Sequence, residues 1–226
     1  MKITYLGHNS LFIETAEHRI MVDPFISGNP VNNKVKVNDY YPDYILLTHA
    51  HQDHVADVET VATLGNSKII SNFEIVTYYD KKGFQGHGMN TGGSYEFPFG
   101  KLTCVVAHHS SSFVDGTYGG NPNGYILTSN GKTIYIAGDT SLTYDMKLIP
   151  QLCGKLDLAI LPIGDNFTMG PKEAAVSADF VECYKVLGCH YDTFPPIEID
   201  HDRAKDIFSK NGKELLLLEI GESLEV

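Results

Sequence analysis

Short runs of apolar residues, each bounded by glycine, proline, asparagine or aspartate, recur along the chain. Runs of about four to eight residues bounded in this way are typical of β-strands. The pattern predicts strands at Ile3–Leu6, Leu11–Glu14, Ile20–Val22, Tyr44–Thr48, Lys68–Ser71, Leu102–Ala107, Tyr125–Thr128, Thr133–Ala137, Leu158–Pro162 and Leu215–Ile220.

Longer segments between these runs have apolar residues at helical spacing. They predict helices at Val55–Leu64, Phe73–Asp80, Leu142–Leu152, Lys172–Leu187 and Arg203–Lys210. In the fourth of these, Pro171 stands at the first turn and Gly188 just past the end, which are favoured start and stop residues. Its Ala174, Ala178 and Val181 fall on one face, as in a helix that covers a core. Strands dominate the early chain and alternate with helices later, which favours sheets covered by helices.

A weak internal repeat relates the two halves of the chain. An apolar run ends at Asp23 and the next ends at His49, 26 positions later; Asp139 and Asp165 end two later runs at the same separation. Two such halves packed face to face would bring four strand tips to one edge. We therefore predict a single domain over residues 1–226 made of two pseudo-equivalent halves, with chance similarity as the open alternative.

The composition narrows the class of protein. The chain has 226 residues, enough for a substantial core, with 42% hydrophobic and 20% charged residues, which argues against disorder. The formal net charge of −11 repels phosphate backbones at long range, so we expect no nucleic-acid partner. A small molecule is the expected partner, and a homo-oligomer stays open.

The expected cellular location of the protein depends on whether the sequence contains targeting or membrane-spanning segments. No apolar run approaches the ~20 residues that cross a bilayer, and the first residues read as a strand and not as a signal peptide. The four cysteines show no CxxC spacing, which is typical of free thiols in a reducing compartment. We therefore expect a cytoplasmic protein without a membrane partner.

Four metal-ligand side chains follow the predicted strand Tyr44–Thr48 within six residues: His49, His51, Asp53 and His54. In an extended segment, residues two apart project to the same side, so His49 and His51 can hold one ion. The turn into the next helix would direct Asp53 and His54 to a second point nearby. Imidazole nitrogen and carboxylate oxygen suit zinc, manganese or iron.

The segment His49-Ala-His-Gln-Asp-His54 resembles the HxHxDH signature of the metallo-β-lactamase superfamily. Other stretches resemble one branch of it, the small metal-dependent hydrolases of unknown substrate, which are related to lactonases acting on sugar-acid lactones. These stretches are Gly7–Ser10, Val22–Phe25, His109–Ser111, Ala137–Thr140, Pro162–Pro171 and His190–Pro195. The resemblance implies an α+β fold, the αββα sandwich, with two mixed β-sheets packed face to face and helices on the outside.

The resemblance also implies the remaining ligands. A histidine after the strand Leu102–Ala107 should complete the first ion site, and the family's His-x-Ser-Ser motif favours His109 over its neighbour His108. Asp139 should bridge both ions, and His190 should complete the second site. The set is then His49, His51, His109 and Asp139 for one ion, and Asp53, His54, Asp139 and His190 for the other. We expect two divalent ions, zinc first, with manganese, iron or nickel as alternatives.

Further residues near the site are assigned by family position. His8 is expected to contact substrate or orient a ligand, and Asp23 to support a ligand histidine. Asp165, Asn166 and Met169 are expected to form the pocket wall. The glycine-rich stretch from His87 to Gly93 could form a lid. Asp192 stands where the branch has asparagine.

The expected activity is metal-dependent hydrolysis of an ester, lactone or amide bond in a small molecule. The nucleophile would be a hydroxide bridging the two ions, and Asp53 could accept or relay a proton. A phosphodiesterase with the same site is the alternative within hydrolases. A non-hydrolytic metal-binding or redox module is the alternative from another class.

Overall fold

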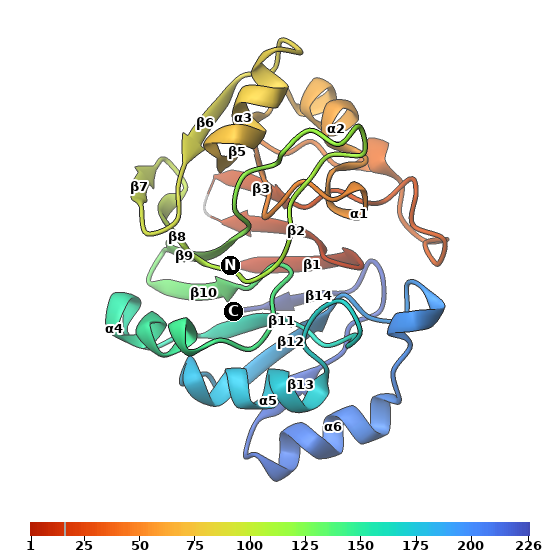
Figure 1. Ribbon diagram of the computed structural model, residues 1–226, viewed down its shortest axis with the longest axis vertical. Coiled ribbons are helices and arrows are strands. Elements are labelled where there is room, and N and C mark those ends of the chain that lie inside the picture. Colours follow the sequence, from red (N-terminus) through yellow and green to blue (C-terminus); the bar gives the residue numbers. More distant parts are fainter. Residues whose placement is uncertain (16) are drawn as a thin grey trace.

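The structure is a computed structural model that describes residues 1–15 and 17–226. It contains two seven-stranded sheets lying one against the other, with helices covering their outer faces (Figure 1). No helix among the described residues is both long and apolar enough to cross a bilayer.

The first sheet has the order β14-β1-β2-β3-β4-β5-β6. Its strands are β1 (Lys2–Gly7), β2 (Ser10–Thr15), β3 (His18–Val22), β4 (Tyr44–Leu46), β5 (Lys68–Asn72), β6 (Gly86–Met89) and β14 (Ser223–Glu225). Neighbours from β14 to β3 are antiparallel, and neighbours from β3 to β6 are parallel.

The second sheet has the order β13-β12-β11-β10-β9-β8-β7. Its strands are β7 (Ser94–Phe97), β8 (Gly100–Val106), β9 (Asn123–Ser129), β10 (Lys132–Ile136), β11 (Leu158–Pro162), β12 (Lys185–Cys189) and β13 (Glu214–Leu216). Neighbours from β7 to β10 are antiparallel and those from β10 to β13 are parallel, so the arrangement repeats that of the first sheet. The predicted internal repeat would produce this correspondence between the sheets. That the two halves are pseudo-equivalent stays a prediction.

The helices lie on the outside of the sandwich. They are α1 (Gln52–Val55), α2 (Val58–Gly65), α3 (Phe73–Asp80), α4 (Ile149–Cys153), α5 (Pro171–Phe180) and α6 (His201–Lys210), with 3₁₀ turns η1 (Val37–Asp39), η2 (Tyr144–Leu148) and η3 (Pro195–Ile197). In Figure 1, α2 and α3 lie at one end of the molecule and α5 and α6 at the other, with the strands between them.

Side-chain alternation along the strands separates three apolar layers. Ile134 and Ile136 point between the two sheets, where they join residues of both sheets, whereas Tyr135 and Ala137 point toward the helices of their own sheet. A third layer packs the first sheet against α2 and α3. The expected αββα sandwich of two mixed sheets is therefore confirmed, because successive strand residues face opposite sides and each face is covered.

The predicted helix Lys172–Leu187 is wrong in its second half. Helix α5 ends at Phe180, and Lys185–Cys189 is strand β12, buried between β11 and β13. Gly188 is no helix stop: a Cβ there would lie 2.6 Å from Ile163 Cδ1, so glycine allows close packing within the sheet. The apolar spacing of α5 happened to continue into the strand, and a short apolar run does not distinguish the two states.

Other boundaries also differ from the prediction. The helix expected at Val55–Leu64 is divided into α1 and α2, and the one at Leu142–Leu152 into η2 and α4. The strand expected at Leu215–Ile220 ends at Leu216, and β6, β7 and β14 were not predicted. The proposed lid at His87–Gly93 is also wrong, because Gly86–Met89 is strand β6, paired with β5, and Gly92 and Gly93 make backbone hydrogen bonds with Cys104 of β8.

Truncation of Leu127 tests the packing between the sheets. Leu127 lies on β9, fully buried in the layer shared by both sheets. Leu127→Ala should lower the free energy of unfolding by about 2–5 kcal/mol, because lost transfer energy and a cavity add up. Urea denaturation measures the change. The same substitution at the exposed Leu152 should cost less than about 0.5 kcal/mol, and equal effects at both positions would contradict the assigned core.

Candidate metal centre

The polar side chains of the site all follow strands that run in one direction within their sheet. His8 follows β1, Asp23 follows β3, and the segment from His49 to His54 follows β4. In the second sheet, His109, Asp139 and His190 follow β8, β10 and β12. Because the carboxyl ends of such strands meet at one edge, residues far apart in the sequence converge there.

His49, His51 and His109 form the first group of candidate ligands. One nitrogen from each ring lies within 4.8 Å of the others, and Nε2 of His49 is 3.0 Å from Nδ1 of His51. Burial lowers the pKa of all three rings, and most strongly that of His49. The three rings are therefore neutral at pH 7, which is the form that binds metals.

Hydrogen bonds determine which nitrogen of His49 and His51 faces the site. The Thr48 hydroxyl donates its only proton to Asp23 Oδ2 at 2.6 Å, so it accepts from His49 Nδ1 at 3.0 Å. Nε2 of His49 is then unprotonated and available. On His51, Nε2 lies 3.2 Å from the Ser110 hydroxyl, which leaves Nδ1 toward the group. Outer partners that fix a ring in this way are usual for metal ligands.

Asp53, His54 and His190, together with His8, form the second group, again with one atom of each within 4.8 Å of the others. Nδ1 of His54 donates to Asp23 Oδ2 at 2.9 Å, so its Nε2 faces the site. Burial lowers the pKa of His54, but the carboxylates of Asp139 and Asp23 outweigh it and raise this pKa well above its usual value. A proton on Nε2 thus competes with any cation for that atom.

Asp139 lies between the two groups. Its Oδ2 is 3.0 Å from Nε2 of His190, 3.4 Å from that of His54, 3.5 Å from that of His109 and 3.9 Å from that of His49. Burial alone would raise its pKa, but His190 and His54 lower it well below the usual range, so the group is ionised. The preceding Gly138 has φ +61°, and a Cβ there would lie 2.8 Å from Thr48. This close approach brings Asp139 against the segment after β4 that carries His49 and His51.

The donor set fits bound cations. Nε2 of His54, Oδ1 of Asp139 and Nδ1 of His190 are buried and have no hydrogen-bond partner among the residues that the structure describes. Unpaired buried polar atoms are rare and costly in proteins. Cations between the two groups would satisfy His54 and Asp139, and a nitrogen–oxygen ligand set of this kind suits zinc and its first-row neighbours.

His8 holds Asp53. Its Nε2 lies 3.1 Å from Asp53 Oδ2 and its Nδ1 lies 2.9 Å from the Thr193 hydroxyl. Burial lowers the pKa of His8 to about 4, so the ring is neutral and donates from Nε2 to the ionised Asp53. Burial raises the pKa of Asp53, but the hydrogen bond from His8 and the charge of His54 outweigh it and lower the pKa well below its usual value. The tie between His8 and Asp53 was not apparent from the sequence.

Of the two neighbouring histidines after β8, the structure brings His109 to the cluster. His108 is exposed, and its Nε2 lies 3.3 Å from Asp145 on the surface. Asp192, the residue that departs from the family pattern, lies outside the cluster and pairs with His201 at 2.6 Å.

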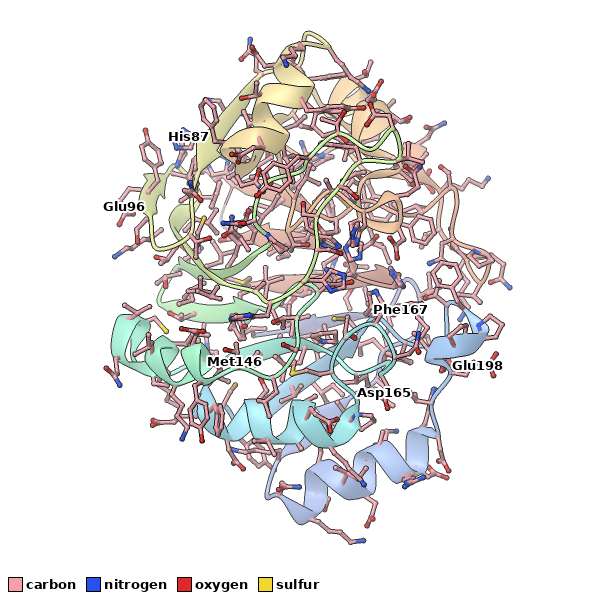
Figure 2. The ribbon with its side chains drawn as sticks, in the orientation of Figure 1. His87, Glu96, Met146, Asp165, Phe167 and Glu198 are labelled. Carbon is pink, nitrogen blue, oxygen red and sulfur yellow. The ribbon has the colours of Figure 1, made fainter. Side chains whose placement is uncertain are left out.

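A cavity of about 490 Å³ opens onto the cluster. It is lined by His51, Asp53, His109, Ser110, Asp139, Phe167, His190, Phe194 and Pro196. The expected wall residues Asp165, Asn166 and Met169 do not line it: Met169 is buried in the core, and Asp165 lines a different cavity. Their neighbour Phe167 does line the cavity. Figure 2 shows His87, at the start of the proposed lid, on the other side of the molecule from Phe167. Substrate contact by Asp165, Asn166 and Met169 stays a prediction without support from the cavity lining.

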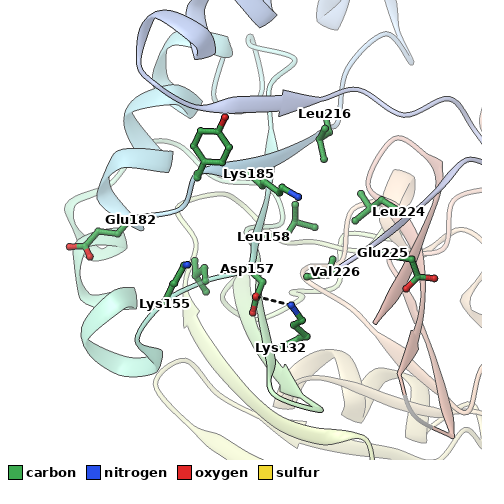
Figure 3. A pocket seen from close by; sticks show the side chains of 12 residues that line it. Lys132, Lys155, Asp157, Leu158, Glu182, Lys185, Leu216, Leu224, Glu225 and Val226 are labelled. Carbon is green, nitrogen blue, oxygen red and sulfur yellow. Dashed lines mark hydrogen bonds and ion pairs between the residues drawn. The ribbon is translucent and has the colours of Figure 1, made fainter.

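A second cavity, of about 420 Å³, contains none of the cluster residues (Figure 3). Three lysines, Lys132, Lys155 and Lys185, line it together with apolar residues of β11 and β13. Lys132 pairs with Asp157 at 3.2 Å. The described residues that line this second cavity include no histidine, so we assign the chemistry of the protein to the first cavity.

Comparisons with known proteins agree with this geometry. Residues 2–190 match the family described as the Beta-lactamase superfamily domain. Proteins named "UPF0173 metal-dependent hydrolase" from Flavobacterium johnsoniae and Christiangramia forsetii are 59% and 56% identical, each over the full length of both chains. The solved structure of Igni18, a metallo hydrolase from Ignicoccus hospitalis, has a TM-score of 0.89 and 33% identity over 99% of this chain and 97% of that one.

The relation to sugar-acid lactonases stays a prediction.

The fold, the converging candidate ligands and the full-length relatives together support one family assignment. This chain belongs to the β-lactamase superfamily and, within it, to the UPF0173 family of metal-dependent hydrolases.

Proposed function

We propose that this metal-dependent hydrolase cleaves an ester, lactone or amide bond of a small molecule at a centre of two divalent ions, with zinc as the first candidate. The observation that carries the proposal is the position of Asp139. Its Oδ2 lies within 3.9 Å of one ring nitrogen from each of four histidines, which belong to both ligand groups. A carboxylate in this place offers a shared anion to two neighbouring cations.

The two groups offer separate ligand sets. His49, His51 and His109 provide three nitrogens for one ion, and Asp53, His54 and His190 provide two nitrogens and a carboxylate for the other. Ions bound there would supply a hydroxide nucleophile at neutral pH and would stabilise negative charge that develops on the substrate. Which metals bind follows from availability as much as from these ligands, because the set suits several first-row ions.

The protein's own groups position the reaction. Asp53 lines the cavity, is ionised and is held by His8, so it can accept or relay a proton from a fixed place. Ser110 also lines the cavity, and its hydroxyl contacts His51 Nε2 at 3.2 Å. Asp23 holds His54 and, through Thr48, His49. These contacts keep the ligands in place before any substrate arrives.

Phosphodiester cleavage is the competing activity for the same ions. Nucleotide or phosphate substrates are usually held by lysine or arginine outside the reacting centre. The described residues that line the cavity include neither. This lining favours a carboxylic acid derivative over a phosphodiester.

We also propose a cytoplasmic location. All four cysteines are free thiols, three of them buried, as is usual in a reducing compartment.

A substrate panel tests the class of bond. We expect carboxylic esters and lactones, such as para-nitrophenyl butyrate and γ-lactones, to be turned over with a kcat/KM at least about tenfold above that for bis-para-nitrophenyl phosphate. Chelation should abolish turnover, and added zinc should restore it. Preference for the phosphodiester would replace the proposed bond class, and turnover that survives complete metal removal would contradict the mechanism.

Replacement of Asp139 tests the shared ligand. In Asp139→Ala both ions lose a ligand and repel each other more strongly, so bound metal should fall from two ions to one or fewer per chain. Turnover of the best ester or lactone should fall by about 100-fold or more. Circular dichroism should show an intact fold, because Asp139 lies at a strand end. Elemental analysis gives the stoichiometry.

The matched control is Asp145→Ala, since the Asp145 carboxylate lies outside the cluster, where it pairs with the exposed His108 and accepts from the Thr143 hydroxyl. It should keep both ions and full turnover. A folded Asp139→Ala protein with two ions and undiminished turnover would refute the bridging role.

A further inference from the structure

We propose that the substrate carries an uncharged, apolar group next to the bond that is cleaved, and that Phe167, Phe194 and Pro196 recognise this group. The inference rests on the proposed function, because it concerns the same cavity. It adds the chemical class of the part of the substrate that does not react.

The lining of the cavity divides into two kinds of surface. His51, Asp53, His109, Asp139 and His190 are candidate metal ligands. The remaining lining residues are Ser110, Phe167, Phe194 and Pro196, of which three are apolar. Ser110 Oγ accepts from His51 Nε2, so the one polar group in this part of the lining is a hydroxyl beside the candidate metal ligands. We call Phe167, Phe194 and Pro196 the apolar wall; a substrate at the candidate metal ligands would lie next to it. The cavity has the usual size for small molecules.

A charged substituent has no partner on this wall. The described lining residues include no lysine or arginine, and the chain as a whole carries a formal charge of −11. A carboxylate or phosphate outside the reacting centre would lose hydration without gaining an ion pair. A sugar acid would also leave most of its hydroxyls without partners there. The wall thus favours an alkyl or aryl group.

Phe167 is held in place by the loop after β11. Asp165 and Asn166 have φ of +61° and +53°, a region that residues other than glycine seldom adopt. Asp165 N donates to Met169 O at 3.0 Å, and Asn166 N donates to Asp165 Oδ1 at 2.8 Å. The buried Met169 anchors the loop, and its N donates to Thr140 O beside Asp139. These three residues therefore position Phe167, which is 55% exposed at the cavity.

Phe194 and Pro196 are the other two apolar residues of the lining. Phe194 packs with its ring edge against His8, at 5.7 Å between centroids, and against Phe25 at 6.3 Å. The two prolines that follow it restrict the backbone of η3. Because the loop backbone at Phe167 and the backbone of η3 are both held by the fold, the apolar residues keep their places at the cavity before a substrate binds.

Binding of hydroxamic acids tests the proposal without requiring turnover. Acetohydroxamic, hexanohydroxamic and succinohydroxamic acid share one metal-chelating head and carry a methyl, an alkyl or a carboxylate tail. Calorimetry with the zinc-loaded protein should give a Kd for the hexanoyl probe at least about tenfold below that for the succinyl probe. The predicted gain for the alkyl tail over the methyl is up to about fourfold per buried methylene.

Substitution of Phe167 separates the wall from the metal centre. Phe167→Ala should weaken the hexanoyl probe by about fivefold to tenfold, and leave the acetyl probe and the metal content unchanged. Phe167→Lys should move the preference toward the succinyl probe. Phe73→Ala is the matched control, because Phe73 is a 64% exposed phenylalanine that does not line the cavity. It should change no Kd.

Equal affinity for the hexanoyl and succinyl probes, or an unchanged hexanoyl Kd in Phe167→Ala, would overturn the proposal. A protein that binds none of the three probes would overturn the metal centre and the proposal with it. Discrimination between tails by a protein that turns over no ester, lactone or amide would support the apolar wall and overturn the proposed bond class.

Discussion

The carboxylate of Asp23 ties the loops of the first sheet to both groups of metal ligands. It is fully buried and accepts hydrogen bonds from Asn9 Nδ2, the backbone N and hydroxyl of Thr48, and His54 Nδ1, at 2.6–2.9 Å. A buried charge is tolerated only when its oxygens are satisfied in this way. Through His54 it orients one ligand of the second group, and through Thr48 it fixes the tautomer of His49 in the first. One buried charge thus orients donors in both groups of candidate ligands.

Residues that follow equivalent strands of the two sheets have different roles at the site. Asp23 follows β3 and Asp139 follows β10, the equivalent strand in the order of the second sheet. Asp23 accepts hydrogen bonds that orient candidate ligands, whereas Asp139 lies between the two groups of candidate ligands. His49 and Asp165 likewise follow the equivalent strands β4 and β11, and one is a candidate ligand while the other holds the loop of Phe167. The metal groups and the wall that faces them therefore come from the same edge of the sandwich.

Much of this site could be predicted because its densest part is local. His49, His51, Asp53 and His54 follow one buried strand, so spacing alone indicates a metal site. His109, Asp139 and His190 came from family resemblance, since nothing local joins them. The apolar part of the lining was not predicted, because Phe167 and Phe194 are far apart in the sequence and line one cavity only in the folded chain.

The fold shows the same division. Long buried strands such as β9 and β11 were predicted correctly in kind and place. Short strands at the sheet edges, such as β6, β7 and β14, contain glycine or exposed polar residues and have little periodicity to detect. β12 was mistaken for helix because its apolar residues continue the spacing of α5. Pairing between distant strands decides these cases, and a local pattern does not contain it.

The central claim is that two cations share Asp139 between two ligand groups. Anomalous diffraction from crystals of the zinc-loaded protein, recorded on both sides of the zinc absorption edge, tests it most directly. The account predicts two anomalous peaks on either side of the Asp139 carboxylate, one among His49, His51 and His109 and the other among Asp53, His54 and His190, with ligand distances of about 2.0–2.2 Å. A single peak, or ions that Asp139 does not touch, would contradict it.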